Sequence, residues 1–347
     1  MVTSSVRPNA PSARPSARPS GLPVAAVGPR GKSAARARAT RRREIVSAQG
    51  GDTGPPSASS SQTAERPRNV GEMLERARAF LERKGVEEAR LDADLLVAHA
   101  LEVDRLHLLL RLEEPVAEEE LVRARSLLQR RAATEPVAYI TGAREFYGRS
   151  FGVCSGVLIP RPETELIVDL ARDHLADREQ APRILDIGTG SGCLAITLAL
   201  EVSSATVHAV DVSGEALEVA RANATSLDAE VTWLEQDGLQ AAGDGAPWDL
   251  IVCNPPYVNP AERESLAPEV RDHEPAGALF APEDDVHYWV RSLAQGARGW
   301  LRSGGLMLVE LGHEQGPAAL ELGRQADPEA RVEQDLAGIP RVLVLGA

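Results

Sequence analysis

The stretch RILDIGTGSGCLAITLAL, residues 183–200, decides the fold, because an apolar strand leads directly into a glycine-rich loop and then into a helix. The strand covers residues 183–187, and the helix begins at Cys193. Glycines let backbone N–H groups approach a ligand closely, and the N-terminus of the following helix attracts a carboxylate or a phosphate. The stretch therefore predicts an α/β fold with a ligand site where this strand ends.

The loop places its glycines at Gly188, Gly190 and Gly192, with Asp186 two residues upstream and Thr189 inside the loop. This spacing is G-x-G-x-G, whereas the dinucleotide fingerprint is G-x-G-x-x-G, so the loop favours S-adenosylmethionine over a nicotinamide cofactor. We expect these five residues to bind that cofactor. The alternative for Asp186 is that it caps the helix.

Two further acids follow predicted strands and extend this site. Asp211 ends the second strand, where its carboxylate can accept hydrogen bonds from both ribose hydroxyls. Asp237 follows the third strand and can accept from the adenine amino group. The alternatives are that Asp211 caps the next helix together with Ser213, and that Asp237 only makes a turn.

Strands and helices alternate after Thr164, which predicts a mostly parallel sheet with helices on both faces. We expect strands at residues 183–187, 206–210, 230–234, 250–253 and 306–310, and helices at residues 193–200, 214–224, 290–301 and 317–325. The last two strands, near residues 331–334 and 342–345, are close enough in sequence to form a terminal antiparallel pair. This α/β domain covers residues 161–347.

The chain before this domain has three parts. Residues 1–68 are rich in Pro, Ser, Ala, Gly and Arg without apolar periodicity, which predicts a disordered basic extension. Residues 69–135 contain three amphipathic runs that predict a small helical bundle ending before Pro136. Residues 136–160 mix β-forming residues with glycines, which predicts a β-hairpin connector.

Charge and composition exclude several classes of protein. The net charge is -13, although residues 1–68 hold 12 Lys and Arg against 3 Asp and Glu. The remainder of the chain is therefore strongly acidic, which disfavours direct binding of nucleic acid. Apolar runs are too short for a membrane span or a secretory signal. The three cysteines lack a C-x-x-C pair and the seven histidines lack ligand spacing, so we expect no disulfide framework and no metal. A cytoplasmic protein is expected; the alternatives for residues 1–68 are an organellar transit peptide or a misassigned start codon.

The segment Asn254-Pro255-Pro256-Tyr257 follows the predicted strand that ends at Cys253. Because the prolines lack N–H groups, the chain cannot continue as a paired strand, and nearby carbonyls are free for a ligand. The Asn254 side-chain oxygen and a backbone carbonyl can hold both hydrogens of a planar –NH2 group, and Tyr257 can stack on it. The alternative is a rigid turn with an Asn cap.

The glycine loop, the ribose acid and this segment together resemble the signature of methyltransferases that act on an amino nitrogen of a base or on a glutamine side-chain amide. Further segments resemble the protein-(glutamine-N5) methyltransferases that modify peptide chain release factors: residues 139–142, 145–148, 158–165, 269–279, 304–312, 315–316 and 335–338. The most specific are Ile159 to Glu165 and Asn254 to Tyr257.

This resemblance implies a seven-stranded Rossmann-like methyltransferase sheet, a hairpin connector, and a helical domain at residues 69–135 that helps to grip a class I release factor. The methyl acceptor would be the glutamine of the Gly-Gly-Gln loop, in support of translation termination. The runner-up is an adenine-N6 or guanine-N2 nucleic-acid methyltransferase. A protein that binds without catalysis is the third hypothesis.

The resemblance also assigns roles to residues. Asn254, Pro255 and Tyr257 would be catalytic and would bind the substrate together with Pro256 and Arg161. Asn254 would also contact the cofactor. Arg161 and its neighbour Glu163 equally suit the start of a helix at Pro162. One departure is visible, because members of the family often have an aromatic residue directly after the third-strand acid, where this chain has Gly238.

Overall fold

The computed structural model describes residues 66–347, apart from residues 177 and 179, so most of the predicted extension lies outside the described residues. Residues 66–68 already contact the helical bundle. The Arg66 guanidinium donates to the Val116 carbonyl at 2.9 Å and lies 3.0 Å from the Glu118 carboxylate. The first helix begins at Val70, shortly after these residues.

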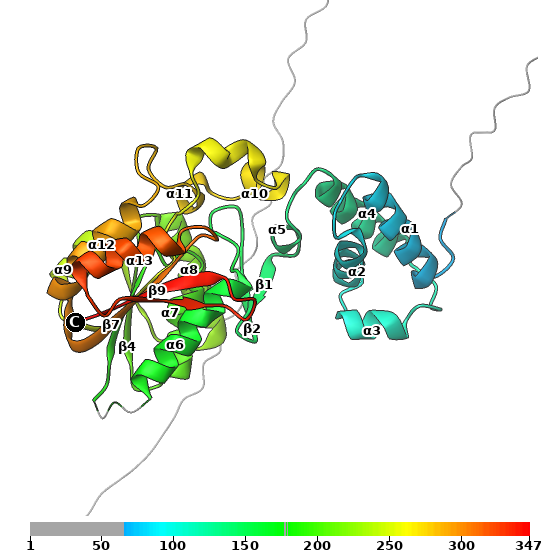
Figure 1. Cartoon of the computed structure of the whole chain (residues 1–347). Coiled ribbons are helices and arrows are strands. Elements are labelled where there is room, and N and C mark those ends of the chain that lie inside the picture. Colours follow the sequence, from blue (N-terminus) through cyan, green and yellow to red (C-terminus); the bar gives the residue numbers. More distant parts are fainter. Residues whose placement is uncertain (1–65, 177, 179) are drawn as a thin grey trace, which may run out of the picture. The chain divides into compact units, whose positions relative to one another are not determined.

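The N-terminal part is a bundle of helices, as predicted (Figure 1). Its helices are α1 (Val70–Arg83), α2 (Ala89–Ala100), α3 (Arg105–Leu110) and α4 (Glu118–Ala132). The three amphipathic runs correspond to α1, α2 and α4, and they share a buried core that includes Leu81, Leu96 and Leu121. Helix α3 is not among the predicted helices, because its leucines are mostly exposed and leave no buried periodicity to detect.

The connector differs from the prediction in its first half. Residues 137–141 form the short helix α5 (Val137–Thr141), in which the Pro136 carbonyl accepts from Tyr139 N and Ile140 N at 3.0 Å. Gly142 ends this helix with a φ of 76°, which glycine adopts without strain. The hairpin is confined to β1 (Ala143–Phe146) and β2 (Arg149–Gly152).

A seven-stranded sheet forms the centre of the C-terminal domain, in the order β5-β4-β3-β6-β7-β9-β8. Its strands are β3 (Arg183–Ile187), β4 (Thr206–Asp211), β5 (Thr232–Glu235), β6 (Trp248–Cys253), β7 (Leu301–Glu310), β8 (Arg331–Gln334) and β9 (Pro340–Gly346). Strands β3 to β7 are parallel, whereas β9 pairs antiparallel with both β7 and β8. The predicted fold class and its terminal antiparallel pair are confirmed.

Helices cover both faces of the sheet (Figure 1). One face packs against α6 (Glu165–Leu175), α7 (Cys193–Glu201) and α8 (Gly214–Leu227), and the other against α9 (Gly238–Asp244), α12 (Tyr288–Trp300) and α13 (Gly316–Ala326). Side chains of a strand alternate between the faces, so Ile184 joins the first cluster while Leu185 and Ile187 join the second. The short helix η1 (Pro162–Thr164) precedes α6. Three further short helices follow β6: η2 (Pro260–Ser265), α10 (Pro268–His273) and α11 (Ala276–Leu279).

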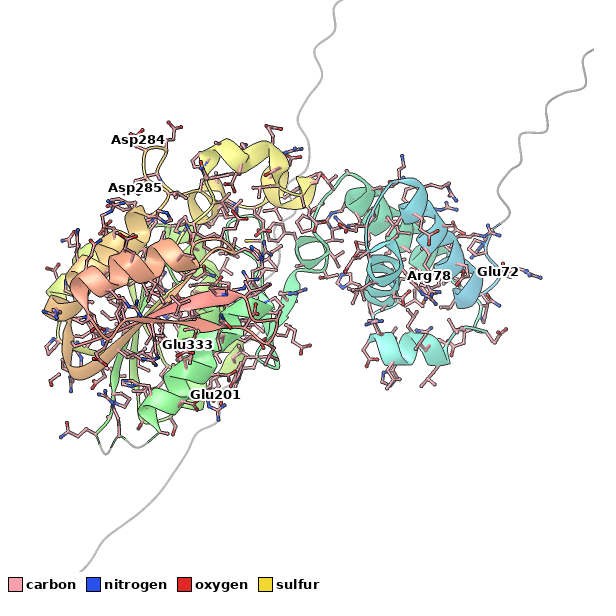
Figure 2. All side chains as sticks on the ribbon, in the orientation of Figure 1. Glu72, Arg78, Glu201, Asp284, Asp285 and Glu333 are labelled. Atoms are coloured by element: carbon pink, nitrogen blue, oxygen red, sulfur yellow. The ribbon has the colours of Figure 1, made fainter. Side chains whose placement is uncertain are left out.

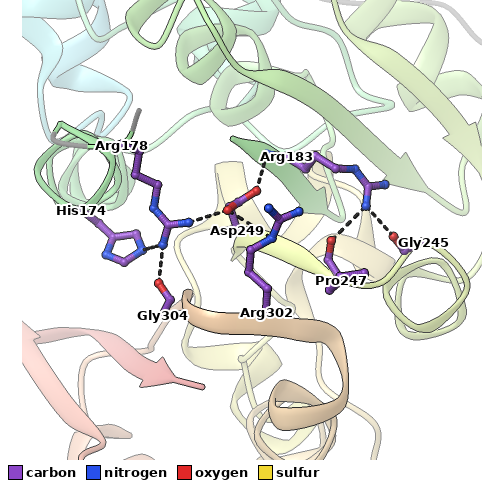
Figure 3. A network of polar contacts seen from close by, with 8 residues as sticks. All are labelled: His174, Arg178, Arg183, Gly245, Pro247, Asp249, Arg302 and Gly304. Atoms are coloured by element: carbon purple, nitrogen blue, oxygen red, sulfur yellow. Dashed lines mark hydrogen bonds and ion pairs between the residues drawn. The ribbon is translucent and has the colours of Figure 1, made fainter. Parts of the chain in front are cut away.

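The amino-terminal edge of the sheet is held by a buried carboxylate, Asp249 on β6 (Figure 3). Asp249 pairs with Arg178 and with Arg302, and it accepts from the Arg183 backbone N–H at 2.8 Å. Arg178 also contacts the His174 ring at 3.0 Å. This network connects α6, β3, β6 and β7 at the edge opposite to the glycine loop, so it stabilises the sheet without entering the candidate site.

Acidic side chains are spread over the surface. Figure 2 shows Asp284 and Asp285 on the loop before α12, Glu201 at the end of α7 and Glu333 on β8. Among the described residues, no helix is both long and apolar enough to cross a membrane.

Candidate active site

The site lies where the parallel strands end, at the point at which the strand order reverses. From β3 the chain moves to β4 and β5 on one side, and then to β6 and β7 on the other. Such a switch point opens a crevice at the carboxyl edge of the sheet. Register pairs Ile187 with Cys253 and Cys253 with Val309, so the glycine loop, Asn254 and Glu310 follow three neighbouring strands at the same level.

The glycine loop turns sharply between β3 and α7. Gly188, Gly190 and Gly192 have φ values of 71°, 54° and 81°, a region that side-chain-bearing residues rarely adopt. The Gly188 and Thr189 N–H groups donate to the Val210 carbonyl at 2.9 and 3.0 Å. At Gly192 a Cβ atom would press against the side chains of Ile196, Ala220 and Trp233, so close packing excludes any larger residue there.

The loop fits a ligand that needs close contact with the backbone. A Cβ atom at Gly188 or at Gly190 would meet nothing within 4 Å, so the space above the loop is open. The loop leads into the N-terminus of α7, and Asp211 stands beside it. Backbone amides, a helix N-terminus and a neighbouring carboxylate match the carboxylate and ribose groups of S-adenosylmethionine.

Asp186 acts on the shape of this loop. Its side chain is buried, and one carboxylate oxygen accepts from Thr189 Oγ1 at 2.6 Å and from Ala195 N at 3.2 Å. Burial raises the pKa of Asp186 to about 7. Asp186 thus joins the loop to the first turn of α7. It caps this helix, as the alternative proposed, and it also supports the loop at which we expect the cofactor to bind.

The other two acids have structural partners as well. The Asp211 carboxylate accepts from Gly190 N with one oxygen and from Ser213 N with the other, each at 2.9 Å. Each oxygen retains a second lone pair for a ribose hydroxyl. Asp237 is the N-cap of α9 and accepts from Gln240 N at 3.0 Å, so it begins a helix and does not only make a turn.

The structure explains the departure at Gly238. A Cβ atom at this position would overlap the side chain of Ile187 at the end of β3. An aromatic residue cannot enter here unless Ile187 changes as well. The next residue, Leu239, packs its partly buried side chain against the core under α9 and α12.

The Asn254-Pro255-Pro256-Tyr257 segment leaves β6 beside the end of β7. Pro255 is buried, and Asn254 Nδ2 donates to Thr164 Oγ1 at 3.2 Å. Thr164, between η1 and α6, donates its hydroxyl to Glu310 Oε2 at 2.6 Å. Sequence reasoning gave Thr164 and Glu310 no role in the site. An acid at the end of an apolar strand, the pattern that identified Asp211, was the available signal for Glu310.

Gln315 is a third residue without a predicted role. Its side-chain oxygen accepts from Gly312 N at 3.0 Å, and its Nε2 donates to the carbonyls of Val286 at 3.3 Å and Tyr257 at 3.4 Å. Gln315 therefore holds the acceptor loop against the turn after β7. Burial raises the pKa of Tyr257 to about 12, so its phenol is neutral at physiological pH.

Arg161 is tied to a second loop rather than left free. Its guanidinium lies 2.6 Å from Glu274 Oε1, and Glu274 Oε2 accepts from Ile159 N at 3.2 Å. Glu163 lies 3.7 Å from Arg341 on β9. The helix predicted to start at Pro162 is present as η1 followed by α6, and Thr164 at their junction is the residue of this segment that contacts Asn254.

Comparison with known proteins gives the following similarities. A family model described as the PrmC N-terminal domain matches residues 72–142, and one described as the methyltransferase small domain matches residues 164–270. The release factor glutamine methyltransferase of Chlorobaculum tepidum is 42% identical over 289 residues, which cover 80% of this chain and 97% of that protein. That of Koribacter versatilis is 41% identical over 264 residues, covering 76% and 93%.

Solved structures are more distant. A T. thermophilus 16S rRNA N2 G1207 methyltransferase in complex with AdoMet and guanosine aligns with 20% identity and a TM-score of 0.42. The alignment covers 59% of this chain and 49% of that one.

Proposed function

The chain belongs to the family of release factor glutamine methyltransferases, and we propose that it methylates the glutamine of the Gly-Gly-Gln loop in class I peptide chain release factors through the residues at the ends of β3, β4, β6 and β7. The enzyme is an S-adenosylmethionine-dependent protein-glutamine N5-methyltransferase. The observation that carries our assignment of residues is the contact of Asn254 Nδ2 with Thr164, because it engages Nδ2 and leaves Oδ1 as the group of this amide that can accept from the substrate.

The cofactor site comprises the glycine loop and Asp211. Gly188 and Gly190 expose backbone to the open space above the loop, while Gly192 lets the loop pack closely against its neighbours. We assign the free lone pairs of Asp211 to the ribose and Asp237 to the adenine amino group. Asp186 and Thr189 support the loop from below through their hydrogen bond. When bound, S-adenosylmethionine supplies a methyl group that its sulfonium makes electrophilic.

The acceptor amide is a weak nucleophile, because its nitrogen lone pair is delocalised into the carbonyl. Asn254 Oδ1 and the Pro255 carbonyl each accept one of its hydrogens and so fix the nitrogen in one orientation. Pro256 restricts the conformation of the loop, since its ring fixes φ. Tyr257 provides a planar neutral surface against which the amide packs. Positioning of this kind supplies several kcal/mol, up to about 7–11 in ideal intramolecular cases.

Charge is redistributed rather than created in this transfer. The glutamine nitrogen forms a bond to the methyl carbon as the sulfur–carbon bond breaks, and one of the two amide hydrogens leaves as a proton to water. Neither cysteine beside the site takes part, because burial raises the pKa of Cys193 to about 12 and that of Cys253 well above its usual range.

The helical bundle formed by α1 to α4 is the part of the chain that we assign to binding of the release factor. Its core is separate from the clusters around the sheet, so the bundle offers a folded surface of its own. We place the enzyme in the cytoplasm, where release factors act on ribosomes. The adenine-N6 or guanine-N2 alternative is not favoured, because the relatives from Chlorobaculum tepidum and Koribacter versatilis, 42% and 41% identical, are named for glutamine methylation.

A methylation assay with labelled S-adenosylmethionine tests this assignment. The substrates are a class I release factor, the same factor with Gln→Ala in its Gly-Gly-Gln loop, and a mixture of RNA and DNA. We expect label only in the unmodified factor, with mass spectrometry placing one methyl group on the glutamine. Label in the Gln→Ala factor or in nucleic acid would overturn the proposed substrate.

A further inference from the structure

Glu310 is a buried carboxylic acid whose burial is unfavourable for folding. Its side chain is 2% exposed at the end of β7, and no Lys or Arg among the described residues forms an ion pair with it. A carboxylate removed from water without a cation costs free energy unless hydrogen bonds compensate. Its side chain accepts a hydrogen bond from the Thr164 hydroxyl, and the nearby Asn254 side chain is the smallest of the influences on its pKa, which it lowers. A costly acid beside the acceptor residue points to a role in the reaction.

The hydrogen-bond chain has a direction. Thr164 Oγ1 carries a single hydrogen, and it donates that hydrogen to Glu310 Oε2 at 2.6 Å. Towards Asn254 the hydroxyl can therefore only accept, which requires Asn254 to present Nδ2, 3.2 Å away. The Asn254 amide is planar, so fixing Nδ2 on this side fixes Oδ1 on the other.

We propose that Glu310 and Thr164 are positioning residues for methyl transfer. The ionised Glu310 carboxylate fixes the direction of the hydrogen bonds that link it through Thr164 to Asn254, so that Asn254 presents Oδ1 to the glutamine –NH2 group. The inference rests on the proposed function, since it assumes that Asn254 receives that amide. The two residues are 146 positions apart in sequence, and they meet because η1 lies across the end of β7. The chain also places negative charge behind Asn254, which strengthens Oδ1 as an acceptor as the amide hydrogens become more positive.

Protonation of Glu310 reverses the direction of the hydrogen bonds that link Glu310, Thr164 and Asn254. A neutral carboxyl can donate to Thr164 Oγ1, whose own hydrogen then turns towards Asn254 and binds Oδ1. Burial raises the pKa of Glu310 to about 7, and the hydrogen bond from Thr164 opposes this rise. Of the charged groups that face Glu310, Glu163 on η1 raises its pKa further and Arg341 on β9 lowers it.

The remaining titratable groups near Glu310 do not change charge in this range. Burial raises the pKa of Tyr257 and of Cys193 to about 12 and that of Cys253 higher than usual, so all three stay neutral. Asp186 also has a pKa of about 7, but it supports the glycine loop, and saturating cofactor offsets a change in cofactor affinity. We therefore expect kcat, measured at saturating cofactor, to fall as the pH drops through about 7.

Three variants test the hydrogen bonds that link Glu310, Thr164 and Asn254, and one matched control accompanies them. Thr164→Val keeps the shape of the side chain and removes the hydroxyl, Thr164→Ser restores a hydroxyl, and Glu310→Gln removes the ionisable group. The control is Thr197→Val on α7, a buried threonine whose hydroxyl has no hydrogen-bond partner among the described residues. Each variant is assayed as the full chain for kcat, KM for the release factor, cofactor Kd and Tm.

We expect Thr164→Val and Glu310→Gln to lower kcat about 10-fold or more, the scale of losing one hydrogen bond to a charged group, with cofactor Kd and KM within about 2-fold. Thr164→Ser should recover most of the kcat lost in Thr164→Val, and Thr197→Val should behave as wild type. Glu310→Gln should lose the decline of kcat below pH 7. Adding Thr164→Val to Asn254→Ala should cause no further loss, because both act through the same oxygen.

The inference is overturned if Thr164→Val keeps wild-type kcat, if Thr164→Ser fails to rescue, or if Glu310→Gln keeps the wild-type pH profile. Additive losses in the double variant would also overturn it. A purely structural role predicts a lower Tm together with a weaker cofactor Kd, which these measurements detect. Failure of the wild-type enzyme to methylate any release factor would instead refute the proposed function, so the two failures are distinguishable.

Discussion

Asp211 is the residue that we expect to contribute most to cofactor binding. Its two carboxylate oxygens accept from Gly190 N and Ser213 N, and so hold the loop beside the site. Asp211→Ala removes these backbone contacts and the acceptors for the ribose. Hydrogen bonds to a charged group contribute roughly 1.5–3 kcal/mol each, so we expect the S-adenosylmethionine Kd to rise about 10- to 100-fold. Isothermal titration calorimetry measures this change.

Asp173→Ala is a suitable control for that measurement, because Asp173 is an exposed carboxylate on α6. It should leave the Kd unchanged. An unaltered Kd in a folded Asp211→Ala variant would remove Asp211 from the cofactor site.

Glu310 also links pH to stability. Because its pKa is raised to about 7 in the folded state, the folded state favours the neutral carboxyl. The stabilisation is complete below the pKa of the unfolded chain, near 4.5, and it is lost as the pH rises through about 7. Glu310→Gln removes the charge, so we expect its Tm at pH 8 to exceed that of the wild type by a few degrees, roughly 2–4 °C per kcal/mol. Scanning calorimetry at pH 5 and pH 8 tests this, and a lower Tm at pH 8 would contradict the pKa assignment.

At the scale of single elements, the strands were the most predictable part of the fold. Residues 183–187 have the same bounds in the prediction and in β3, because a short apolar run between a proline and a glycine loop leaves little choice. Helix α9 was missed, since GLQAAGD offers no apolar period and depends on the Asp237 cap and on core contacts of Ala241 and Ala242. Tyr139 and Ile140 were placed in a hairpin because of their β propensity, but Pro136 starts a helix there.

The Asp249 network is the element-scale feature that should matter for stability and not for chemistry. Asp249 is buried, and its removal leaves Arg178 and Arg302 without their carboxylate at the amino edge of the sheet (Figure 3). Breaking a buried ion pair costs about 3–5 kcal/mol, so we expect Asp249→Ala to lower the free energy of unfolding by about this amount. Urea denaturation measures it.

Cofactor binding supplies the second readout for Asp249→Ala. The Kd for S-adenosylmethionine should stay near the wild-type value, because the glycine loop lies at the other edge of the sheet. Asp284→Ala, in an exposed loop, serves as a control with no expected effect on unfolding. Wild-type stability in Asp249→Ala would show that this network is dispensable.

At the scale of the whole molecule, the sequence identifies the sheet, its helices and the two loops that meet at its edge, because each is encoded within a short stretch. The contacts between distant stretches are not encoded locally. Thr164 on η1 meets Glu310 at the end of β7 across 146 positions, and Arg161 meets Glu274 across 113 positions. The acceptor site could therefore be located from sequence, but the hydrogen bonds that orient Asn254 could not.

The described residues form their cores among themselves, which gives a whole-molecule prediction for the N-terminal extension. Residues 1–65 have too little apolar content to contribute a core of their own. Deleting them should change the Tm by no more than about 2 °C and kcat by no more than about 2-fold, as for surface changes in general. A deletion that starts at residue 69 should be less stable, because it also removes Arg66 and its contacts. A large fall in Tm for the shorter deletion would contradict this expectation.

The central claim is that Asn254 acts on the transition state, because its Oδ1 binds an amide hydrogen that becomes more positive as the nitrogen attacks. The most direct test is steady-state kinetics of Asn254→Ala with the release factor as substrate, after calorimetry has established that the cofactor still binds. We predict a kcat about 10²–10³-fold below wild type, by analogy with the loss of one preorganised oxyanion donor. A variant that raises only KM and keeps the wild-type kcat would contradict the account, because Asn254 would then bind the ground state and the transition state equally.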